Sequence, residues 1–495
     1  MKLEFHGHDY RYAVEQSLLA FFPGERPVYD GEGEDSLAAV TLACSGEDWT
    51  ASTVLRRGGG EASGLARARI AGTLDSYEAE REKQKIVKLS FFQAARELTG
   101  VTPPWGALTG IRPGKLASRF LEEGMAEAEV DRILADTYFV SPARRRMCVE
   151  TAREGLRAAG DLAPGDIAVY IGIPFCPTRC AYCSFVSNSV EKSFHLVELY
   201  LQALLSEVAS AGTMVRDLGL RVRAFYMGGG TPTTLTADQM DRLLTAFETA
   251  FDLRDCSERT IEAGRPDTID PEKLEVLKRH GTTRVSINPQ TMEDPVLRAI
   301  GRHHTAEDIR RAMAQVRAAA FPSVNMDLIA GLPEDTPAGF RRSLDECLSL
   351  GADNITVHTL SLKKGSRITL EGTRLPGPEE VGAMLDYADP ALRAAGFAPY
   401  YLYRQKYMSG SFENTGWCLP GRENLYNIYI MEELCSILSL GAGGSTKMVD
   451  AAGNRIERVF NLKYPLEYTQ RPEKISANQQ AFAEFYRRVM KSERS

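Results

Sequence analysis

The sequence predicts an α/β protein: a partial (β/α)6, TIM-like barrel that carries an N-terminal α+β domain and a C-terminal extension. Beyond residue 166, six mostly apolar strand candidates alternate with helical segments, which is typical of a parallel sheet covered by helices. Polar and glycine residues gather at the C-terminal ends of these strands, where barrel enzymes build active sites. With six units rather than eight, an open barrel is the more economical prediction, although a doubly wound sheet fits the same count.

The first third of the chain is predicted to be a separate region. Residues 1–75 mix short apolar runs with glycine-rich breaks, which indicates a small α+β fold. A helix is expected over 76–100, and further helix from about 116 to 158. The Pro/Gly-rich stretch between them predicts either an ordered loop that exposes Arg112 and Lys115 or a turn with solvated charges.

A Pro/Gly-containing stretch that interrupts the helical pattern marks the first domain boundary. The stretch 159-AGDLAPGD-166 ends the helical pattern and precedes the first barrel strand. We therefore divide the chain into an N-terminal accessory domain over 1–163, a barrel core over 164–375 and a mostly helical C-terminal extension over 376–495.

The barrel elements are expected in strict alternation. The strand candidates are 167–174, 224–230, 259–264, 284–290, 323–333 and 355–361. The helix candidates between them are 191–211, 237–251, 271–280, 305–320 and 337–350. The polar and glycine residues at the strand ends are Cys176, Gly228–Gly230, Glu262, Gln290 and Asp327. Because parallel strands end at one edge, we expect these residues to share one rim.

Composition limits the classes of function. The 495 residues carry a net charge of −7, which argues against a general nucleic-acid or anionic-membrane surface. The first residues lack a signal-peptide pattern, and no apolar run reaches the roughly 18 residues of a membrane-spanning helix. Nine cysteines, an odd number, fit poorly with a secreted disulfide framework. We expect a cytoplasmic protein without a membrane span and without nucleic-acid partners.

Three cysteines stand within eight residues in 170-YIGIPFCPTRCAYCSF-185, directly after the first barrel strand: Cys176, Cys180 and Cys183. The last two could form a dithiol redox pair, which normally lies at a helix N-terminus in a thioredoxin-like unit. Structural zinc needs a fourth ligand, and His195 is twelve residues further on. A [4Fe–4S] cluster can be held by three thiolates with one iron left open, and the spacing favours this interpretation.

These motifs, taken in order, resemble a known family. Cys-x3-Cys-x2-Cys after a first strand, with Tyr182 before the last cysteine, resembles the signature of the radical S-adenosylmethionine (SAM) superfamily. The runs YIGIPFC, 228-GGGTPT-233 and 327-DLIAGLP-333 follow the order and spacing of oxygen-independent coproporphyrinogen III oxidases. The region over 1–163, with its LTGIRPGK loop, most resembles the HemZ-type coproporphyrinogen dehydrogenase branch.

The resemblance implies a [4Fe–4S] cluster and one or two molecules of SAM as cofactors. The three clustered cysteines would hold the cluster, and the amino and carboxylate groups of SAM would complete the open iron. No side chain is expected to be catalytic, because the radical is generated at cluster-bound SAM. The residues implied to bind the cofactor are Tyr170, Gly229, Gly230, Thr231, Glu262, Gln290, Arg302 and Asp327, the last three through a second SAM.

Each of these positions also has a purely structural interpretation. The glycines could form a tight strand-to-helix turn, Glu262 a salt bridge at the rim, and Tyr170 ordinary packing. The cysteines outside the cluster are interpreted as structural; they are Cys44, Cys148, Cys256, Cys347, Cys418 and Cys435.

The function implied by the resemblance is the oxygen-independent oxidative decarboxylation of coproporphyrinogen III to protoporphyrinogen IX in haem biosynthesis. A 5′-deoxyadenosyl radical would remove a propionate β-hydrogen, which is beyond any side-chain base. The partners would be the porphyrinogen, a cellular electron donor and an electron acceptor. A tetra-anionic substrate calls for basic side chains, and the candidates are Arg265, Arg302 and Lys363. His303 and His304 are either further candidates or ordinary surface histidines.

Two positions depart from the family pattern. The best-studied enzymes have a fourth cysteine where Phe185 stands, and a first-strand histidine where Gly172 stands. Phe185 is closer to the related haem chaperones, which keep the cluster but deliver haem to client proteins. Against a chaperone, their Gly-Ala-Gly-Ala-His strand ending is replaced here by 441-GAGGSTK-447. A haem-binding chaperone therefore stays open as the alternative function.

Overall fold

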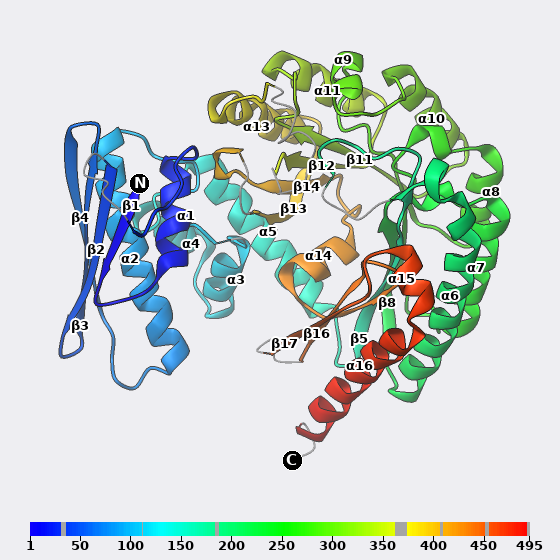
Figure 1. Ribbon diagram of the computed structural model, residues 1–495, viewed down its shortest axis with the longest axis horizontal. Helices are drawn as coiled ribbons and strands as arrows, with labels where there is room; N and C mark the ends of the chain where they lie inside the picture. Colours follow the sequence, from blue (N-terminus) through cyan, green and yellow to red (C-terminus); the bar gives the residue numbers. More distant parts are fainter. Residues whose placement is uncertain are drawn as a thin grey trace. The chain divides into compact units, whose positions relative to one another are not determined.

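The computed structural model describes residues 1–30, 36–110, 112–183, 188–361, 374–405, 409–450 and 455–492 (Figure 1). The chain forms two compact units. The first consists of Met1–Val149 with Arg404–Glu413, and the second of Glu150–Tyr403 with Asn414–Ser495. The division falls inside one long helix, α5 (Pro142–Gly160), and so precedes the breaker at 159–166 that we expected to mark it.

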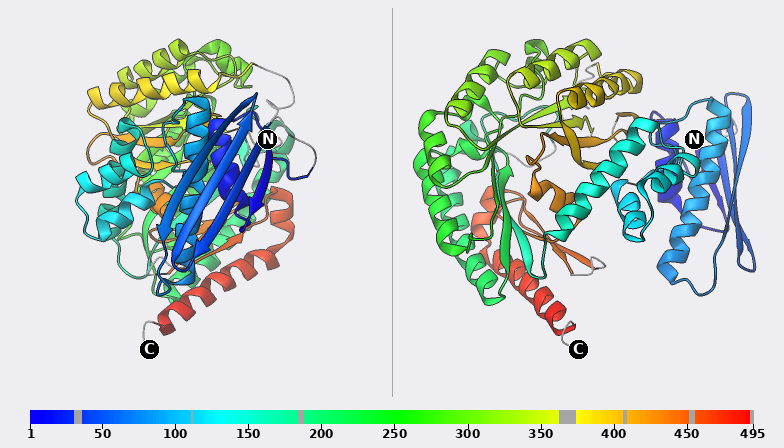
Figure 2. Two further views of the ribbon diagram at one scale, coloured as in Figure 1. Left: turned by 90° about the vertical axis from the view of Figure 1, so that its left-hand side faces the viewer. Right: turned by 180° about the vertical axis from the view of Figure 1, so that it is seen from behind.

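The first unit opens with the α+β fold that the sequence predicts. Its sheet runs in the order β1 (Lys2–His6), β2 (Ser36–Ser45), β3 (Asp48–Arg57) and β4 (Gly60–Arg69). The helices α1 (Arg11–Phe21) and α2 (Ser76–Thr99) cover one face of this sheet (Figure 2). Gly64 permits close packing here, because a Cβ on it would lie 2.0 Å from the carbonyl oxygen of Ser90 in α2.

The rest of the first unit is helical. The stretch expected as helix over 116–158 forms α3 (Gly114–Glu122), α4 (Glu127–Asp136) and α5. The segment Arg404–Glu413 belongs to this unit through buried polar contacts. The carboxylate of Glu413 accepts a hydrogen bond from Trp105 Nε1 at 2.6 Å and pairs with Arg144 Nε at 3.0 Å.

Seven parallel strands form the centre of the sheet in the second unit. In spatial order they are β15 (Ser436–Leu440), β5 (Asp166–Ile173), β8 (Arg221–Gly229), β9 (Glu258–Glu262), β10 (Arg284–Ser286), β11 (Ser323–Ala330) and β12 (Asn354–Thr359). Six of them are the predicted barrel strands, and they lie in the sheet in the predicted order, so the partial barrel is confirmed. β15 is an additional strand, which pairs in parallel with β5 from far along the chain.

The helices between these strands lie on the outer, convex side of the curved sheet (Figures 1 and 2). They are α6 (Val190–Asp217), α7 (Ala237–Ala250), α8 (Pro271–Arg279), α9 (Asp294–Ala299), α10 (Ala306–Ala318) and α11 (Pro337–Ser349). All five predicted helices are present, and α9 is a short addition. No helix in the described ranges is both long enough and apolar enough to cross a membrane.

The sheet stays open, and antiparallel strands form its two edges. β14 (Asn414–Cys418) and β13 (Ala398–Tyr403) extend it beyond β12, and β16 (Ser445–Val449) and β17 (Ile456–Phe460) beyond β15. We expected 376–495 to be mostly helical and separate; instead it supplies five strands to the core sheet. Its helices are α13 (Pro378–Ala394), α14 (Leu425–Glu432), α15 (Pro465–Gln470) and α16 (Pro472–Ser492).

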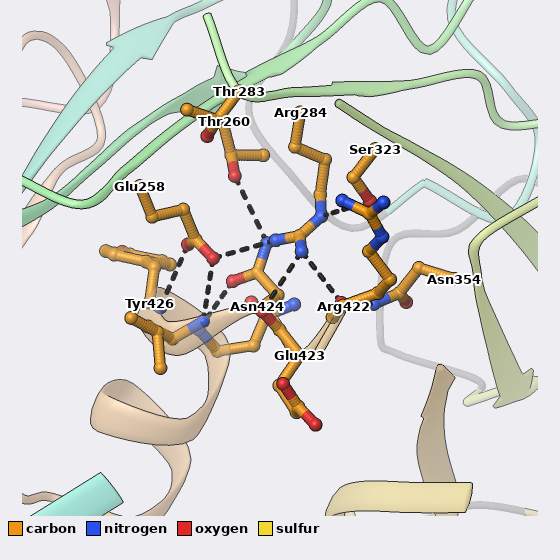
Figure 3. A network of polar contacts seen from close by, with 12 residues as sticks. Glu258, Thr260, Thr283, Arg284, Ser323, Asn354, Arg422, Glu423, Asn424 and Tyr426 are labelled. Carbon is orange, nitrogen blue, oxygen red and sulfur yellow. Dashed lines mark hydrogen bonds and ion pairs between the residues drawn. The ribbon is translucent and has the colours of Figure 1, made fainter. Parts of the chain in front are cut away.

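A buried ion pair ties α14 to the N-terminal ends of the barrel strands (Figure 3). Glu258 and Arg284, the first residues of β9 and β10, pair at 2.8 Å. Arg284 Nη2 also donates to the carbonyl of Arg422 at 2.8 Å. The Glu258 carboxylate accepts hydrogen bonds from the backbone N–H groups of Leu425 (2.8 Å) and Tyr426 (3.2 Å). The pair thus fixes the chain entering α14 beneath the barrel.

Candidate functional site

The three clustered cysteines lie directly after the first barrel strand. Cys176 ends the short strand β6 (Phe175–Cys176), and Cys180 and Cys183 follow in a loop. Two contacts hold this loop against the segment after α9: Ala181 N donates to Ile300 O at 2.9 Å, and the Thr178 hydroxyl to Gly301 O at 3.3 Å. The cysteine loop is therefore anchored to the segment between α9 and α10.

The donor set suits a cluster better than a single ion. Within the described ranges, no three His, Cys, Asp or Glu side chains lie close enough together to hold one metal ion. A single zinc ion would gather its sulfur ligands at about 2.3 Å from one point. A [4Fe–4S] cluster instead takes each thiolate on a different iron, and three thiolates leave one iron open. Cys176, Cys180 and Cys183 supply the number of thiolates that the second arrangement requires, and their binding of the cluster stays a prediction.

The glycine-rich end of β8 and the residues after it are hydrogen-bonded to the end of β5 and to β6, the strand that contains Cys176. Gly230 N donates to Ile173 O, and Thr231 N to Phe175 O, each at 2.7 Å. The Thr231 hydroxyl donates to Cys176 Sγ at 3.6 Å. Hydrogen bonds to cluster sulfurs tune the reduction potential, so Thr231 is placed to act on a cluster bound by Cys176, and its contact with SAM stays a prediction.

Packing within the protein gives a reason for glycine at positions 228, 229 and 230 that does not depend on a cofactor. A Cβ on Gly230 would lie 2.5 Å from Phe175 O, and one on Gly228 would lie 3.0 Å from the Glu262 carboxyl carbon. Gly229 has a φ of +107°, which side chains rarely adopt. Packing within the protein therefore already requires this run of glycines, and contact of Gly229 and Gly230 with SAM stays a prediction.

An aromatic floor underlies the inner face of the barrel. Tyr170, Tyr226 and Tyr426 stack on one another, with ring centroids 4.6 Å apart for Tyr226 and Tyr426 and 6.1 Å for the other two pairs. The Tyr226 hydroxyl donates to Glu262 Oε1 at 2.5 Å. Burial raises the pKa of Glu262 to about 7, although this hydrogen bond acts against it.

Asp327 has the opposite electrostatic surroundings. Burial acts to raise its pKa, but contacts from His358, Asn325 and Thr356 outweigh burial and lower the pKa below the ordinary value. His358 Nε2 lies 3.9 Å from Asp327 Oδ2, and Asn325 Nδ2 donates to Oδ1 at 2.9 Å. The inner face therefore carries one carboxyl that titrates near neutrality and one that stays ionised.

Tyr182 joins the cysteine loop to the other predicted SAM residues. Its hydroxyl donates to Gln290 Oε1 at 3.1 Å and accepts from Arg302 Nη2 at 3.3 Å. Gln290 has a positive φ of 69°, and its backbone N–H donates to Asp327 O at 2.9 Å. Arg302 is buried, and its Nη1 donates to Asn288 O at 2.5 Å. The structure thus brings Gln290 and Arg302 to Tyr182 of the cysteine loop, and places Asp327 beside Gln290 through a backbone hydrogen bond.

The comparisons with known proteins agree with this geometry. The model of the radical SAM superfamily matches residues 170–347. The chain is 39% identical over 415 residues to the oxygen-independent coproporphyrinogen-III oxidase-like protein HemZ of Bacillus subtilis, covering 82% of this chain and 83% of that protein. The chain belongs to the HemZ-like family of radical SAM proteins.

Two further comparisons cover smaller parts of the chain. The heme chaperone HemW of Lactococcus lactis is 29% identical over 285 residues, 56% of this chain and 69% of that protein. The structure of coproporphyrinogen III oxidase HemN from Escherichia coli superposes with a TM-score of 0.52 at 23% identity. That match covers 66% of this chain and 73% of HemN and supports the fold. As a radical SAM protein, the chain uses a [4Fe–4S] cluster and SAM.

Several predicted substrate residues do not take the expected positions. Arg265 is buried and committed to an ion pair, with Nη2 3.0 Å from Asp267 Oδ2. His303 is exposed as expected, but His304 is buried, so the surface interpretation of His304 is wrong. Lys363 lies outside the described residues, as does the departure Phe185.

Backbone lies close to the position of the missing family histidine, Gly172. A Cβ on Gly172 would lie 3.1 Å from the carbonyl oxygen of Ala442, which follows β15. The 441-GAGG-444 turn and Gly172 are therefore matched in size. The segment that replaces the chaperone-type strand ending is therefore the one that a side chain at position 172 would crowd.

Most of the cysteines outside the cluster fit the structural role that the sequence predicts for them. Burial raises the pKa of the thiols of Cys256 (to about 11), Cys347, Cys418 and Cys435 (to about 12), which keeps them protonated at neutral pH. Cys148 is buried as well, whereas Cys44 is exposed in β2.

In the loop predicted to expose two cations, Lys115 is exposed and Arg112 is half-buried.

Sequence reasoning missed four residues of the inner face: Tyr226, Asn325, His358 and Tyr426. Three of them stand within predicted strands, but one sequence does not say which face of a buried strand points inward. Tyr426 lies in α14, far from any motif, and only the fold places it against Tyr226.

Proposed function

We propose that this radical SAM protein converts coproporphyrinogen III to protoporphyrinogen IX by oxygen-independent oxidative decarboxylation. The observation that carries the proposal is the 39% identity to the coproporphyrinogen-III oxidase-like protein HemZ over 82% of the chain. That match extends into the N-terminal region, whereas the heme chaperone of Lactococcus lactis matches 56% of the chain. An oxygen-sensitive open cluster requires reducing surroundings, and we place the activity in the cytoplasm.

The proposed reaction balances for each propionate. The side chain loses a β-hydrogen atom, carbon dioxide and one electron, and becomes a vinyl group. When bound, the reduced cluster and SAM supply the 5′-deoxyadenosyl radical that takes the hydrogen atom. One electron from a cellular donor is consumed for each SAM cleaved, and one electron from the substrate passes to a separate acceptor.

The residues around the cysteine loop would hold and orient the cofactors. Cys176, Cys180 and Cys183 would bind three irons, and the Thr231 hydroxyl would donate to the Cys176 thiolate. Glu262, positioned by Tyr226, is the carboxylate that would accept hydrogen bonds from the SAM amino group. Hydrogen bonds from that amino group would favour the charged carboxylate and so lower the pKa of Glu262 from about 7.

The inner face would exclude water from the reaction. Three stacked tyrosines close the floor below Glu262, and a dry, preorganised surface strengthens electrostatic contacts to the cofactor. His358 beside Asp327 would present a hydrogen-bond donor to a propionate at the rim, in a place where the missing first-strand histidine cannot act. Arg265 is not part of this proposal, because Asp267 already occupies its guanidinium.

An anaerobic incubation tests the proposal. Reconstituted protein, dithionite, SAM and coproporphyrinogen III should yield 5′-deoxyadenosine and products lighter by one and then two formic-acid equivalents, read by mass spectrometry. Deoxyadenosine without a decarboxylated product would keep the radical chemistry and refute the substrate. Tight haem uptake with neither product would instead support the chaperone alternative, which the HemW relatives suggest.

A further inference from the structure

Two buried side chains of α6 bind the turn 441-GAGG-444, which follows β15. The Tyr200 hydroxyl accepts a hydrogen bond from Ala442 N at 2.9 Å, and Glu207 Oε2 accepts one from Gly441 N at 2.7 Å. Tyr200 and Glu207 are 0% and 4% exposed. One helix therefore satisfies two consecutive N–H groups of this turn.

Tyr200 also joins the turn to the chain that leads to Cys176. Its hydroxyl donates to Gly172 O at 2.6 Å, so a single oxygen atom connects the turn after β15 with the end of β5. Its ring packs edge-on against Phe175, the residue before Cys176, with ring centroids 5.4 Å apart. Glycine at position 441 permits this approach, because a Cβ there would lie 2.5 Å from the Tyr200 hydroxyl.

The segment 172–176, which Tyr200 contacts, holds other predicted cofactor residues. Its carbonyl oxygens accept hydrogen bonds from Gly230 N and Thr231 N, each at 2.7 Å. The Thr231 hydroxyl donates to Cys176 Sγ at 3.6 Å. A shift of this segment would therefore displace a predicted cluster ligand and the predicted SAM contacts together.

Glu207 has further partners away from this segment. Its carboxylate accepts from the Tyr468 hydroxyl of α15 at 2.5 Å and from Asn461 Nδ2 at 3.2 Å. Burial raises the pKa of Glu207, although these hydrogen bonds act against burial. The Tyr468 ring contacts that of Tyr200, with centroids 5.1 Å apart, but its hydroxyl reaches the turn only through Glu207.

We propose that Tyr200 is a positioning residue for the cofactors, which holds the segment 172–176 in the arrangement that binds SAM. It acts through Gly172 and Phe175 rather than by contact with a cofactor. Phenylalanine at position 200 would leave Ala442 N buried without a partner, which favours a shift of the turn and of the end of β5. The inference rests on the cofactor contacts of the proposed function and not on its substrate.

Tyr200→Phe and Tyr468→Phe form a matched pair, because each removes one hydroxyl from a buried tyrosine and the two rings touch. SAM binding to the full-length, cluster-loaded variants is measured by anaerobic calorimetry, with iron content and thermal melts alongside. Tyr200→Phe should keep about four irons but bind SAM about tenfold more weakly than wild type. Tyr468→Phe should lower the Tm as much as Tyr200→Phe does and bind SAM like wild type.

Hydrogen–deuterium exchange, read by mass spectrometry, locates the change. Residues 171–176 and 441–444 should exchange faster in Tyr200→Phe than in wild type, and 171–176 should be unchanged in Tyr468→Phe. Wild-type SAM affinity in Tyr200→Phe would overturn the proposal. An equal loss of affinity in both variants would do so too, because lowered stability alone predicts that result.

Exchange also decides the case in which Tyr200→Phe takes up no cluster. Unchanged exchange of 171–176 in the cofactor-free variant would then overturn the proposal, and faster exchange confined to 171–176 and 441–444 would support it. These measurements contain no porphyrinogen. A failure of the proposed substrate therefore leaves their outcome unaffected.

Discussion

Glu262 and Asp327 show how two carboxyls on one surface acquire different charges. Glu262 receives one hydrogen bond, from Tyr226, and burial dominates its pKa. Asp327 receives contacts from His358, Asn325 and Thr356, which together outweigh burial. Environments that separate two carboxyl pKa values in this way are typical of functional sites. The separation implies that Glu262 is held at a cost to stability.

Glu262→Gln should therefore raise the free energy of unfolding of the cofactor-free protein above pH 7. The native pKa of about 7 exceeds the ordinary 4.5, so the native state binds more protons than the unfolded state between these values. Wild-type stability then falls as pH rises through this window, and the loss is complete above it. The gain for the variant should be about 1–2 kcal/mol near pH 8 and smaller near pH 5, measured by urea unfolding.

Glu275→Gln is the matched control, because Glu275 is an exposed carboxylate on α8. It should leave the difference between the two pH values unchanged. Equal stabilities of wild type and Glu262→Gln at both pH values would show that the carboxyl of Glu262 does not have a raised pKa.

Thr231→Val tests the hydrogen bond to Cys176 Sγ. The valine has a similar shape but no hydroxyl, so the cluster should form normally while its thiolate loses a donor. Loss of a weak hydrogen bond should shift the midpoint potential by about 20–40 mV to more negative values, read by a dye-mediated redox titration. Thr234→Val is the control, since that hydroxyl donates to Thr231 O at 2.7 Å and not to sulfur. The same potential in both variants would contradict a role for Thr231 at the cluster.

At the scale of elements, the sequence predicted those strands and helices whose apolar pattern and flanking turns lie within one short segment. The six β–α repeats and the cysteine, glycine and carboxylate positions at the strand ends could be read from the sequence, because each repeat has its own apolar run and turn. β15 could not, because SILSL is five residues long, buried throughout and distant from its partner β5. The inner-face tyrosines and His358 were missed for the same reason, since their neighbours come from other elements.

The buried ion pair between Glu258 and Arg284 holds α14 against the barrel strands, and removing one partner leaves the other as an unpaired buried charge. Arg284→Met should lower the free energy of unfolding by about 3–5 kcal/mol, because Glu258 would keep a buried charge without its cation. The double variant with Glu258→Gln should lose less than the sum of the single changes. Urea unfolding measures both, and Tyr426 should lose its fixed position against Tyr226.

An exposed pair provides the comparison for this prediction. Arg488 pairs with Glu457 at 2.9 Å, with side-chain exposures of 51% and 31%. Arg488→Met should change the stability by less than about 1 kcal/mol. A cost for Arg284→Met no greater than that of Arg488→Met would mean that the buried pair does not hold α14.

At the scale of the whole molecule, the two units are not consecutive in the chain. Arg404–Glu413 connects β13 to β14 of the second unit but belongs to the first. Its Glu413 is buried there with Trp105 and Arg144. Removing residues 1–149 alone would therefore expose a segment whose charges have lost their partners.

The sheet register shows how to separate the units cleanly. Tyr403 and Asn414 are paired in the antiparallel β13–β14 ladder, so a two-residue turn can join them. A chain of residues 150–495 with Asn-Gly in place of 404–413 should fold with one cooperative thermal transition and take up about four irons. The same chain with its natural 404–413 segment should melt lower or aggregate. If the repaired chain aggregates or takes up no iron, the first unit is required for the second to fold, and the division proposed between an accessory unit and a self-sufficient radical SAM core is wrong.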